Sequence, residues 1–204
     1  MLYTYGVLRA LPVLRQIREV EGWLLDDEAD LLLAACTRAT AELPGAAVVE
    51  VGSYCGRSTI VLASAVADSR SGARVFAIDP HEGEVGAADQ RIWSVPPTLE
   101  RFNANIEQAG LRDHVVTIQQ RSFEVAWREP IALLLIDGLH DRQNVERDFR
   151  HFEPWLDPAG YVAFHDYSGW YPGVVAFVDQ LVASENYERV DQAESLALLR
   201  PRRG

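Results

Sequence analysis

A strand that leads through a glycine-punctuated turn into a helix constrains the fold of this chain more than any other feature. Residues 48–51 are apolar enough for a buried strand, except for the acid at position 50, and Gly52 follows directly. Gly56 comes four positions later, and small and apolar residues continue from Ser58 in a helical pattern. Glycine lets the backbone approach a ligand closely, and the first turn of a helix offers free N–H groups. The stretch therefore predicts a ligand-binding turn, although an ordinary tight corner has the same pattern.

The spacing within this turn argues against a dinucleotide ligand. The dinucleotide fingerprint needs Gly-x-Gly-x-x-Gly so that a pyrophosphate can touch the backbone. Here Tyr54 stands in the place of the second glycine, and Glu50 would put a negative charge beside a phosphate. An acid at the strand end suits a ligand with positive charge and hydroxyl groups. S-adenosylmethionine (SAM), which has an ammonium, a sulfonium and a ribose, is such a ligand.

Length, charge and cysteine content limit the class of the protein. A chain of 204 residues fits one domain, and it buries about 70% of its unfolded surface without a disulfide or metal staple. The net charge of −11 argues against a nucleic-acid partner, which would require a basic stripe. Two cysteines, Cys36 and Cys55, indicate a reducing compartment, so we expect a cytoplasmic protein. All nineteen basic residues are arginine, so no lysine can serve as a base.

The N-terminal region has a helical pattern of its own. Apolar residues recur on one helix face at Val7, Leu11, Leu14 and Ile17. This pattern is typical of an amphipathic helix and not of a signal peptide, and the chain contains no apolar run long enough to span a membrane. We expect a single domain over 1–204, with a helical cap or lid over 1–42 and a core over 46–200.

Strand and helix patterns alternate through most of the chain. The strand candidates are Ala47–Val51, Arg74–Asp79, Val115–Gln119, Ile131–Asp137 and Gly160–His165. The helix candidates are Ser58–Ala67, Thr98–Ala109, 142–153 and Val174–Ser184. Such alternation predicts a doubly wound α/β fold, with a parallel sheet and helices on both faces.

The end of the chain breaks this alternation. Tyr187–Asp191 and Leu196–Leu199 are strand candidates joined by a few polar residues, and a link that short allows only antiparallel pairing. We therefore expect a Rossmann-like sheet of seven strands, mostly parallel, with one antiparallel C-terminal strand. Residues 82–97 have weak periodicity and several turn residues, which predicts either a mobile segment near the site or a plain surface loop.

Polar side chains follow several of the expected strands, and ligands bind beyond the carboxyl ends of strands in open parallel sheets. Asp79 comes 27 positions after Gly52 and is placed to accept both hydroxyls of a ribose, or to cap the loop that follows. Ser122 is placed to meet an adenine edge, or to cap a short helix over 123–127.

A second polar group follows the fourth and fifth strand candidates and consists of Asp137, His140, His165 and Asp166. Two carboxylates with an imidazole at neighbouring strand ends predict a divalent-cation site. Oxygen ligands favour Mg²⁺ or Mn²⁺, whereas an imidazole ligand favours Mn²⁺, Fe²⁺ or Zn²⁺. Each histidine could instead be a hydrogen-bonded residue of the core or rim.

Two motifs resemble those of known enzymes. Residues 50–58, Glu-Val-Gly-Ser-Tyr-Cys-Gly-Arg-Ser, resemble the SAM loop of catechol O-methyltransferases, which carry Gly-x-Tyr-Cys-Gly-x-Ser. Residues 135–140, Leu-Ile-Asp-Gly-Leu-His, with Pro-Ala-Gly at 158–160 and Phe-His-Asp-Tyr at 164–167, resemble small bacterial metal-dependent O-methyltransferases. That branch includes enzymes that methylate sugar hydroxyls. The resemblance covers about 46–168 and implies a class I SAM-dependent methyltransferase.

The resemblance implies roles for individual residues. The SAM contacts would be Glu50, Gly52, Ser53, Tyr54, Gly56, Ser58, Asp79, Ser122 and Asp137. The metal ligands would be Asp137 and Asp166, with His165 where the family often has another acid or an amide. His140 stands where the catechol enzymes have a basic lysine, and it would act as the general base beside Asp137.

These roles imply a metal-dependent O-methyltransferase, with Mg²⁺ expected first and Mn²⁺ second. By resemblance, the expected acceptor is a sugar hydroxyl; the alternative is a catechol-like phenol or another natural-product hydroxyl. Trp23, Trp93 and Trp170 suit either kind of ring, or else fill core or dimer contacts. The rival classes are a non-catalytic SAM-binding domain and an NAD-dependent oxidoreductase. We expect a homodimer without nucleic-acid or membrane partners.

Overall fold

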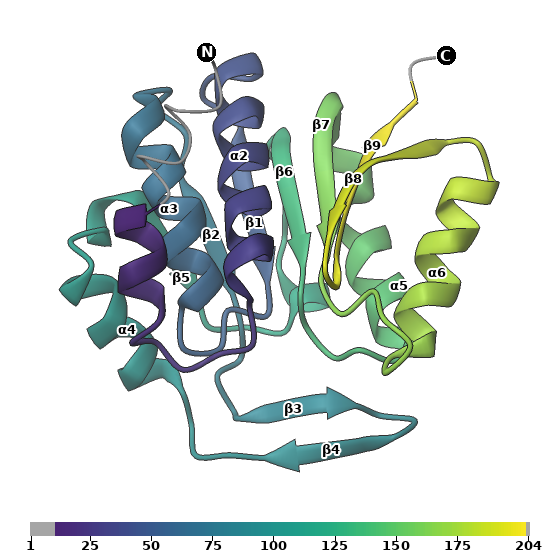
Figure 1. Cartoon of the computed structure of the whole chain (residues 1–204), viewed down its shortest axis with the longest axis horizontal. Coiled ribbons are helices and arrows are strands. Elements are labelled where there is room, and N and C mark those ends of the chain that lie inside the picture. The colour runs from purple at the N-terminus through teal and green to yellow at the C-terminus, as the bar shows by residue number, and fades with distance from the viewer. Residues whose placement is uncertain (1–10, 203–204) are drawn as a thin grey trace.

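The computed structural model describes residues 11–202 and has three layers, with a central sheet between two layers of helices (Figure 1). The seven strands of the sheet lie in the order β5 (Val115–Ile118), β2 (Val75–Ile78), β1 (Ala47–Val51), β6 (Ile131–Ile136), β7 (Leu156–Phe164), β9 (Leu196–Pro201) and β8 (Tyr187–Ala193).

The direction of the strands agrees with the sequence pattern. The pairs from β5 through β7 are all parallel, whereas β9 is antiparallel to both of its neighbours, β7 and β8. The predicted seven-stranded, mostly parallel sheet with one antiparallel C-terminal strand is therefore confirmed. The short turn after β8 folds β9 back into the gap between β8 and β7.

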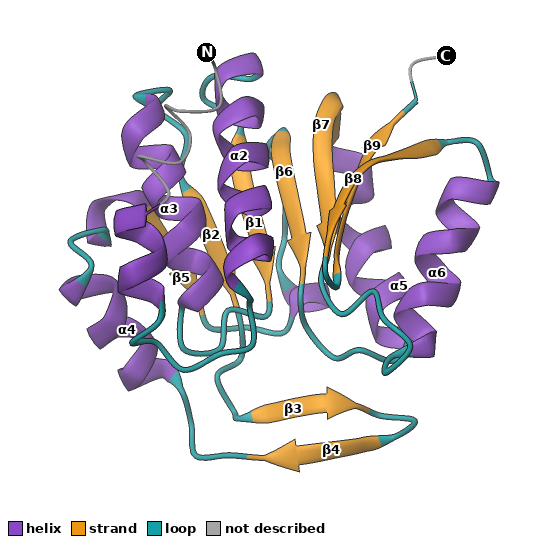
Figure 2. Cartoon of the chain, in the orientation of Figure 1, coloured by secondary structure: helices purple, strands orange, loops and turns teal. Residues whose placement is uncertain are grey.

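Helices cover both faces of the sheet (Figure 2). Buried residues of α2 (Asp26–Glu42), α3 (Arg57–Ser69) and α4 (Leu99–Gln108) belong to the core on one face. Buried residues of α5 (Arg142–Phe152) and α6 (Pro172–Ala183) belong to the core on the other face. Short 3₁₀ turns occupy Arg112–His114, Ser122–Glu124 and Glu153–Trp155.

Each central strand contributes to both cores because successive side chains point to opposite faces. In β6, Leu133 and Leu135 belong to the core under α2 and α3, whereas Leu134 and Ile136 belong to the core under α5 and α6. Both faces of the strand are thus buried. This is why the strand forms a continuous apolar run in the sequence.

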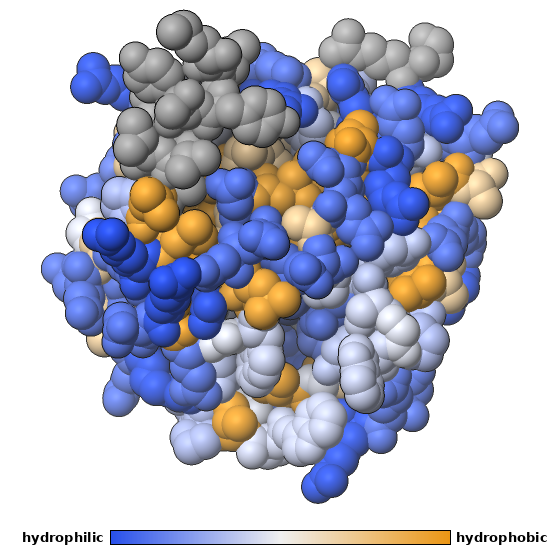
Figure 3. Space-filling view, in the orientation of Figure 1, coloured by the Kyte–Doolittle hydropathy of each residue, from blue (hydrophilic) through white to orange (hydrophobic). Residues whose placement is uncertain are grey.

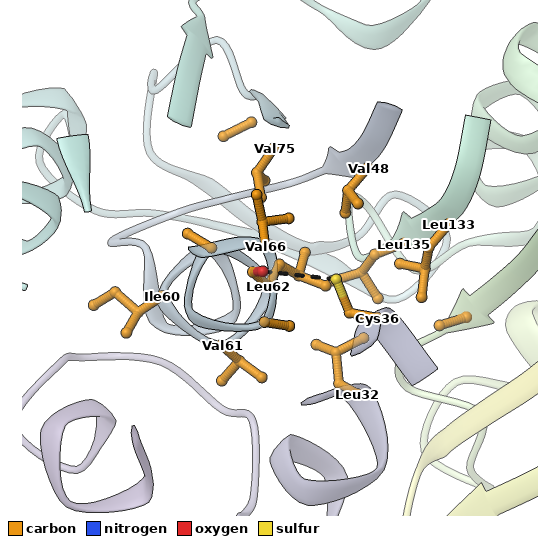
Figure 4. Packing of buried hydrophobic residues seen from close by; sticks show 14 of the residues in the cluster. Leu32, Cys36, Val48, Ile60, Val61, Leu62, Val66, Val75, Leu133 and Leu135 are labelled. Atoms are coloured by element: carbon orange, nitrogen blue, oxygen red, sulfur yellow. Dashed lines mark hydrogen bonds between the residues drawn. The ribbon is translucent and has the colours of Figure 1, made fainter. Parts of the chain in front are cut away.

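Helix α2 is an integral part of the first core. Figure 4 shows Leu32 and Cys36 of this helix among side chains of α3 and of the strands. The Cys36 thiol donates a hydrogen bond to the carbonyl of Leu62, with an Sγ–O distance of 3.6 Å. Cys36 is fully buried, and burial raises the pKa of its thiol to about 12. The thiol therefore serves packing.

The segment before α2 is helical over 11–17, and Ile17 is fully buried in the first core. Val7 of the predicted amphipathic pattern lies outside the described residues. The cap or lid role of 1–42, the homodimer and the cytoplasmic location stay predictions. Between residues 11 and 202, no helix combines the length and apolarity that a membrane span requires.

Residues 82–97 contain a β-hairpin, which corrects the expected loop. Strands β3 (Glu84–Ala87) and β4 (Arg91–Ser94) pair antiparallel and cross the carboxyl-end side of the main sheet (Figure 1). All four residues of β4 are exposed, so no core face imposes a period on its sequence. Gly86 is required in β3, because a Cβ there would lie 2.4 Å from the backbone carbonyl oxygen of Arg91 and 2.7 Å from the ring of Trp93.

Phe149 anchors the core beneath α5. It is fully buried, and its ring centroid lies 5.6 Å from those of Phe164, Phe177 and Tyr187. Phe149→Ala is expected to lower the free energy of unfolding, measured in urea, by about 3–5 kcal/mol. The control Phe123→Ala removes a ring that is 40% exposed, and a loss below about 1 kcal/mol is expected there. Equal losses would contradict this account of the core.

Candidate active site

A cavity of about 930 Å³ lies beyond the carboxyl ends of β1, β2, β6 and β7. The turns after these strands form its wall, together with segment 21–25 before α2, the β3–β4 hairpin and the loop around Trp170. A cavity of this size can hold a cofactor and a small second substrate.

Most of the predicted site residues line this cavity. Among the predicted SAM contacts, those in the lining are Gly52, Ser53, Tyr54, Ser58, Asp79, Ser122 and Asp137. His140, His165 and Asp166 line it as well. Glu50 and Gly56 do not.

The turn after β1 packs closely on the turn after β6 and carries one buried hydroxyl group without a partner within residues 11–202. Gly52 has φ +88°, and a Cβ there would lie 2.1 Å from the carbonyl oxygen of Asp137, so a side chain is excluded. The hydroxyl of Ser53 is buried and has no hydrogen-bond partner among the described residues. A buried polar atom without a partner at a cavity wall fits a bound polar group that completes it. The turn therefore fits a cofactor such as SAM.

Asp79 connects the turns after β1 and β2. Its carboxylate accepts hydrogen bonds from the backbone N–H groups of Tyr54 (2.8 Å) and His81 (2.6 Å). Both donors have positive φ, 46° and 57°, a backbone strain that is common at functional sites. The carboxylate also lines the cavity and retains acceptor capacity for the hydroxyls of a ribose. Asp79 thus caps its own loop and is also available to a ligand.

Two predicted SAM contacts, Glu50 and Gly56, lie outside the cavity lining and have contacts within the fold. Glu50 is fully buried, and the hydroxyls of Ser58 and Thr59 each donate to its carboxyl group at 2.5 Å. Burial raises the pKa of Glu50 to about 8, against the opposing effect of these hydrogen bonds. Glu50 therefore fixes the start of α3 as a largely neutral acid. Gly56 makes room for Phe102 of α4, which a Cβ would approach to 3.2 Å.

Ser122 lies at another part of the cavity wall. Its hydroxyl donates to Asp148 of α5 at 2.6 Å, and Ser122 is the first residue of a 3₁₀ turn and not its cap. The neighbouring ring of Phe123 lies under the guanidinium of Arg147, 4.2 Å from it. The capping role considered for Ser122 is therefore wrong, whereas a contact with an adenine edge stays a prediction.

The structure brings the acid and imidazole residues of the fourth and fifth strand ends together. Nδ1 of His165 lies 3.0 Å from Oδ1 of Asp137 and 3.1 Å from Oδ2 of Asp166. Nε2 of His140 lies 3.2 Å from the same oxygen of Asp166. One candidate ligand atom each from Asp137, His140 and Asp166 falls within 4.8 Å of the others. Asp137 and Asp166 are therefore close enough to share one ion.

Glu28 of α2 completes this cluster, and the sequence did not predict it. Its Oε2 lies 3.1 Å from Nε2 of His165 and accepts the backbone N–H of Leu25. Its Oε1 accepts the hydroxyl and the N–H of Ser195, at 2.6 and 2.9 Å. Glu28 stands 137 positions before His165, so no local motif joins the two. The one available signal was an acid in the first turn of a helix, which also has an ordinary capping role.

The charges of the cluster favour a divalent cation. Burial by itself would lower the pKa of His165, but the carboxylates of Asp137, Asp166 and Glu28 raise it well above its usual value. Burial would raise the pKa of Glu28, but its hydrogen bonds, first that from His165, lower it to about 2. Three carboxylates around one imidazolium leave two negative charges, which matches Mg²⁺ or Mn²⁺.

The same arrangement bears on the ligand role predicted for His165. An imidazolium has N–H donors at both ring nitrogens and no lone pair for a metal. The geometry therefore favours Asp137 and Asp166 as the ligand pair. His165 then positions both carboxylates through its Nδ1 contacts.

The hairpin is tethered over this cluster. Three hydrogen bonds join it to the neighbouring loops: His140 N–H to the Gly86 carbonyl (2.9 Å), Ala88 N–H to Asp141 (3.1 Å) and the Gln90 amide to the Trp170 carbonyl (3.0 Å). The imidazole of His140 packs on the ring of Tyr171, with centroids 4.6 Å apart. The hairpin thus forms a wall of the cavity beside His140.

Comparisons with known proteins agree with this geometry. Residues 49–167 match the family described as "Methyltransferase domain", which confirms the predicted family. The structure is similar to that of the O-methyltransferase NovP, with a TM-score of 0.71 and 16% identity over 87% of this chain and 81% of that one. For the calicheamicin methyltransferase CalS11 the TM-score is 0.65, with 16% identity over 95% of this chain and 91% of that one. For PaMTH1 of Podospora anserina, solved with S-adenosylhomocysteine (SAH), the TM-score is 0.67, with 9% identity over 96% of this chain and 88% of that one.

The raised pKa of Glu50 predicts a pH-dependent stability. Glutamate titrates near 4.5 in the unfolded chain and Glu50 at about 8 in the folded protein, so folding takes up a proton between these values. The stability that neutral Glu50 contributes is complete below about pH 4.5 and is lost as the pH rises toward 8.

Glu50→Gln cannot ionise and should escape this loss. Urea unfolding of the variant, compared with the wild type, should show a gain in stability that grows by about 3–4 kcal/mol between about pH 5 and pH 8. The exposed control Glu107→Gln should show a difference that does not vary with pH. A constant difference for Glu50→Gln as well would contradict the assignment.

Proposed function

Because the chain belongs to the methyltransferase-domain family, we propose that it transfers the methyl group of SAM to a hydroxyl group of a small molecule with the help of a divalent cation. The observation that carries the proposal is the convergence of Asp137 and Asp166 in the same cavity as the turn at Gly52. The O-methyltransferases among the proteins of similar structure support a hydroxyl acceptor.

The cofactor would be held by the turns after β1 and β2. Asp79 would accept the ribose hydroxyls, and Ser53 would engage a polar group of SAM with its unpaired hydroxyl. SAM supplies an electrophilic methyl group, and holding it in line with the acceptor oxygen accounts for much of the rate. Ser122 would face the adenine.

Asp137 and Asp166 would hold the cation through their carboxylate oxygens. When bound there, a divalent cation would supply Lewis-acid activation of the acceptor hydroxyl. His165 and Glu28 keep the two carboxylates in position through the contacts described above. Mg²⁺ is the expected ion, because the pair offers only oxygen ligands.

His140 would act as the general base. Its Nε2 faces Asp166 at 3.2 Å, so the tautomer with a proton on Nε2 can donate to that carboxylate. Nδ1 is then the acceptor for the proton of the substrate hydroxyl. Asp166 would orient the imidazole and stabilise its protonated form, in addition to holding the cation.

The proposed acceptor is a sugar hydroxyl. CalS11, which has a similar fold, is described as a TDP-rhamnose 3'-O-methyltransferase, and this supports a sugar. Tryptophan side chains at the mouth of the cavity suit a ring-shaped substrate. A catechol-like phenol is the second candidate, because the residues of the turn at 50–58 resemble the catechol enzymes.

The first test separates cofactor binding from metal-dependent transfer. SAH should raise the melting temperature of the protein and NAD should not. Transfer of radiolabelled methyl from SAM to rhamnose derivatives or catechol should stop after EDTA treatment and return with Mg²⁺ or Mn²⁺. Asp166→Asn should lower this activity at least about 100-fold while SAH still binds. Asparagine tolerates the positive φ of 60° at this position.

The control for this test is Asp113→Asn, which changes an exposed acid outside the cavity and should leave transfer unchanged. Transfer that survives removal of all divalent cations would refute the metal role. A protein that SAH does not stabilise would refute the proposed function itself.

The second test asks whether His140 is a base or a ligand. As a base, His140→Gln should lower kcat by about 10²–10⁴ and leave unchanged the Mg²⁺ concentration that gives half of the maximal rate. If His140 is instead a metal ligand, His140→Gln should raise the Mg²⁺ concentration that gives half of the maximal rate. The control His114→Gln lies outside the cavity lining and should change neither quantity. Unchanged turnover in His140→Gln would remove His140 from the base role.

A further inference from the structure

Large apolar side chains gather at the mouth of the cavity. Within residues 11–202 nine such side chains are exposed, and five of them line this cavity: Trp23, Leu25, Trp93, Phe123 and Trp170. The three tryptophans, called here the tryptophan rim, have exposed fractions of 60%, 47% and 84%. Figure 3 shows pale and orange residues along the lower part of the molecule, where Figure 1 places the hairpin. Apolar surface concentrated beside a cavity marks a binding site.

The rim comes from three separate parts of the chain, each of which is held in place. The ring of Trp23 lies 5.1 Å from that of Tyr54, whose hydroxyl donates to Glu21. Trp93 stands on β4, with the guanidinium of Arg91 5.9 Å from its ring. The backbone carbonyl of Trp170 accepts the amide of Gln90, as described above. The contacts of Trp23 and Trp93 leave ring surface exposed while limiting the freedom of these two rings, so binding to them costs less ordering, whereas Trp170 is held through its backbone.

The charges around the rim are unfavourable for a diphosphate. Seven residues of the cavity lining are Asp or Glu, and four are Arg. Arg121 is paired with Glu82 and Glu84, and Arg147 with Asp148. The whole chain carries a net charge of −11. A nucleoside diphosphate would therefore bring two or more negative charges to a lining that holds more acids than arginines, and two of its four arginines are already paired with carboxylates.

Resting on the proposed function, we propose that the acceptor is a glycoside whose hydroxyl-bearing sugar is joined to a flat, uncharged aromatic group, and that this group stacks on the tryptophan rim. The sugar lies within the cavity, near Asp137 and Asp166, and the aromatic group lies at the mouth. Flat apolar rings match exposed indole faces, and their lack of charge avoids the repulsion that a diphosphate meets. Nucleoside diphosphate sugars are not the acceptors.

The test compares three probes that carry the same sugar: 4-nitrophenyl α-L-rhamnoside, methyl α-L-rhamnoside and TDP-rhamnose. Dissociation constants are measured by calorimetry on protein saturated with SAH and Mg²⁺. The nitrophenyl glycoside should bind about tenfold more tightly than the methyl glycoside. TDP-rhamnose should bind more weakly than the nitrophenyl glycoside.

Tryptophan variants test whether the rim causes the preference for the nitrophenyl glycoside. Trp170→Ala and Trp93→Ala should each reduce the preference for the nitrophenyl glycoside several-fold and leave SAH affinity unchanged. The matched control Trp155→Ala removes a tryptophan that is 38% exposed outside the cavity lining, and it should keep the full preference.

The outcomes separate this inference from the proposed function. If SAH binds but the nitrophenyl group adds no affinity, or TDP-rhamnose binds most tightly, the inference is overturned and the methyltransferase proposal stands. The inference is also overturned if Trp170→Ala turns a dimer into a monomer in sedimentation while the preference stays intact, because the rim is then a subunit contact. If SAH does not bind, the proposed function fails, and the inference fails with it.

Discussion

The site depends on one buried ion cluster, in which a protonated His165 lies between Glu28 on one side and Asp137 and Asp166 on the other. Burying charge is costly unless partners surround it, and here each member has partners at about hydrogen-bond distance. The cluster also joins α2, the ends of β6 and β7 and the β8–β9 turn, through Glu28 and Ser195. The same contacts that fix the last turn of the fold therefore fix the two carboxylates, and their surplus negative charge suits the cation that we propose.

The parallel sheet determines where this cluster can form. Because β1, β2, β6 and β7 all end at the same edge, residues far apart in sequence meet there, among them Gly52, Asp79 and Asp137. The close approach of Gly52 to the Asp137 carbonyl links the cofactor turn to the acid cluster directly. A donor methyl group and a cation-bound hydroxyl would then share one cavity, which is the spatial requirement of in-line transfer.

Much of this was predictable because it follows from local patterns. The apolar runs of the strands and the short link between β8 and β9 predicted the sheet, and the polar strand ends predicted Asp79, Asp137 and Asp166. The motif did not predict that the side chain of Glu50 is buried. Glu50 belongs to a stretch that resembles a SAM loop, yet its carboxyl group faces α3. The hairpin was missed because no core face imposes a period on β4, and Glu28 because its partner, His165, is 137 positions away. Contacts of that kind depend on how helices dock, which no single segment encodes.

The proposed chemistry requires that Asp137 and Asp166 share one divalent cation. Electron paramagnetic resonance of Mn²⁺, titrated into the SAH-saturated protein, measures this without relying on turnover or on knowledge of the acceptor. We expect one bound Mn²⁺ per chain in the wild type, displaced by Mg²⁺, and a loss of that binding in Asp166→Asn, with SAH affinity retained. Absence of stoichiometric binding in the wild type, or an unchanged Mn²⁺ affinity in the variant, would contradict it.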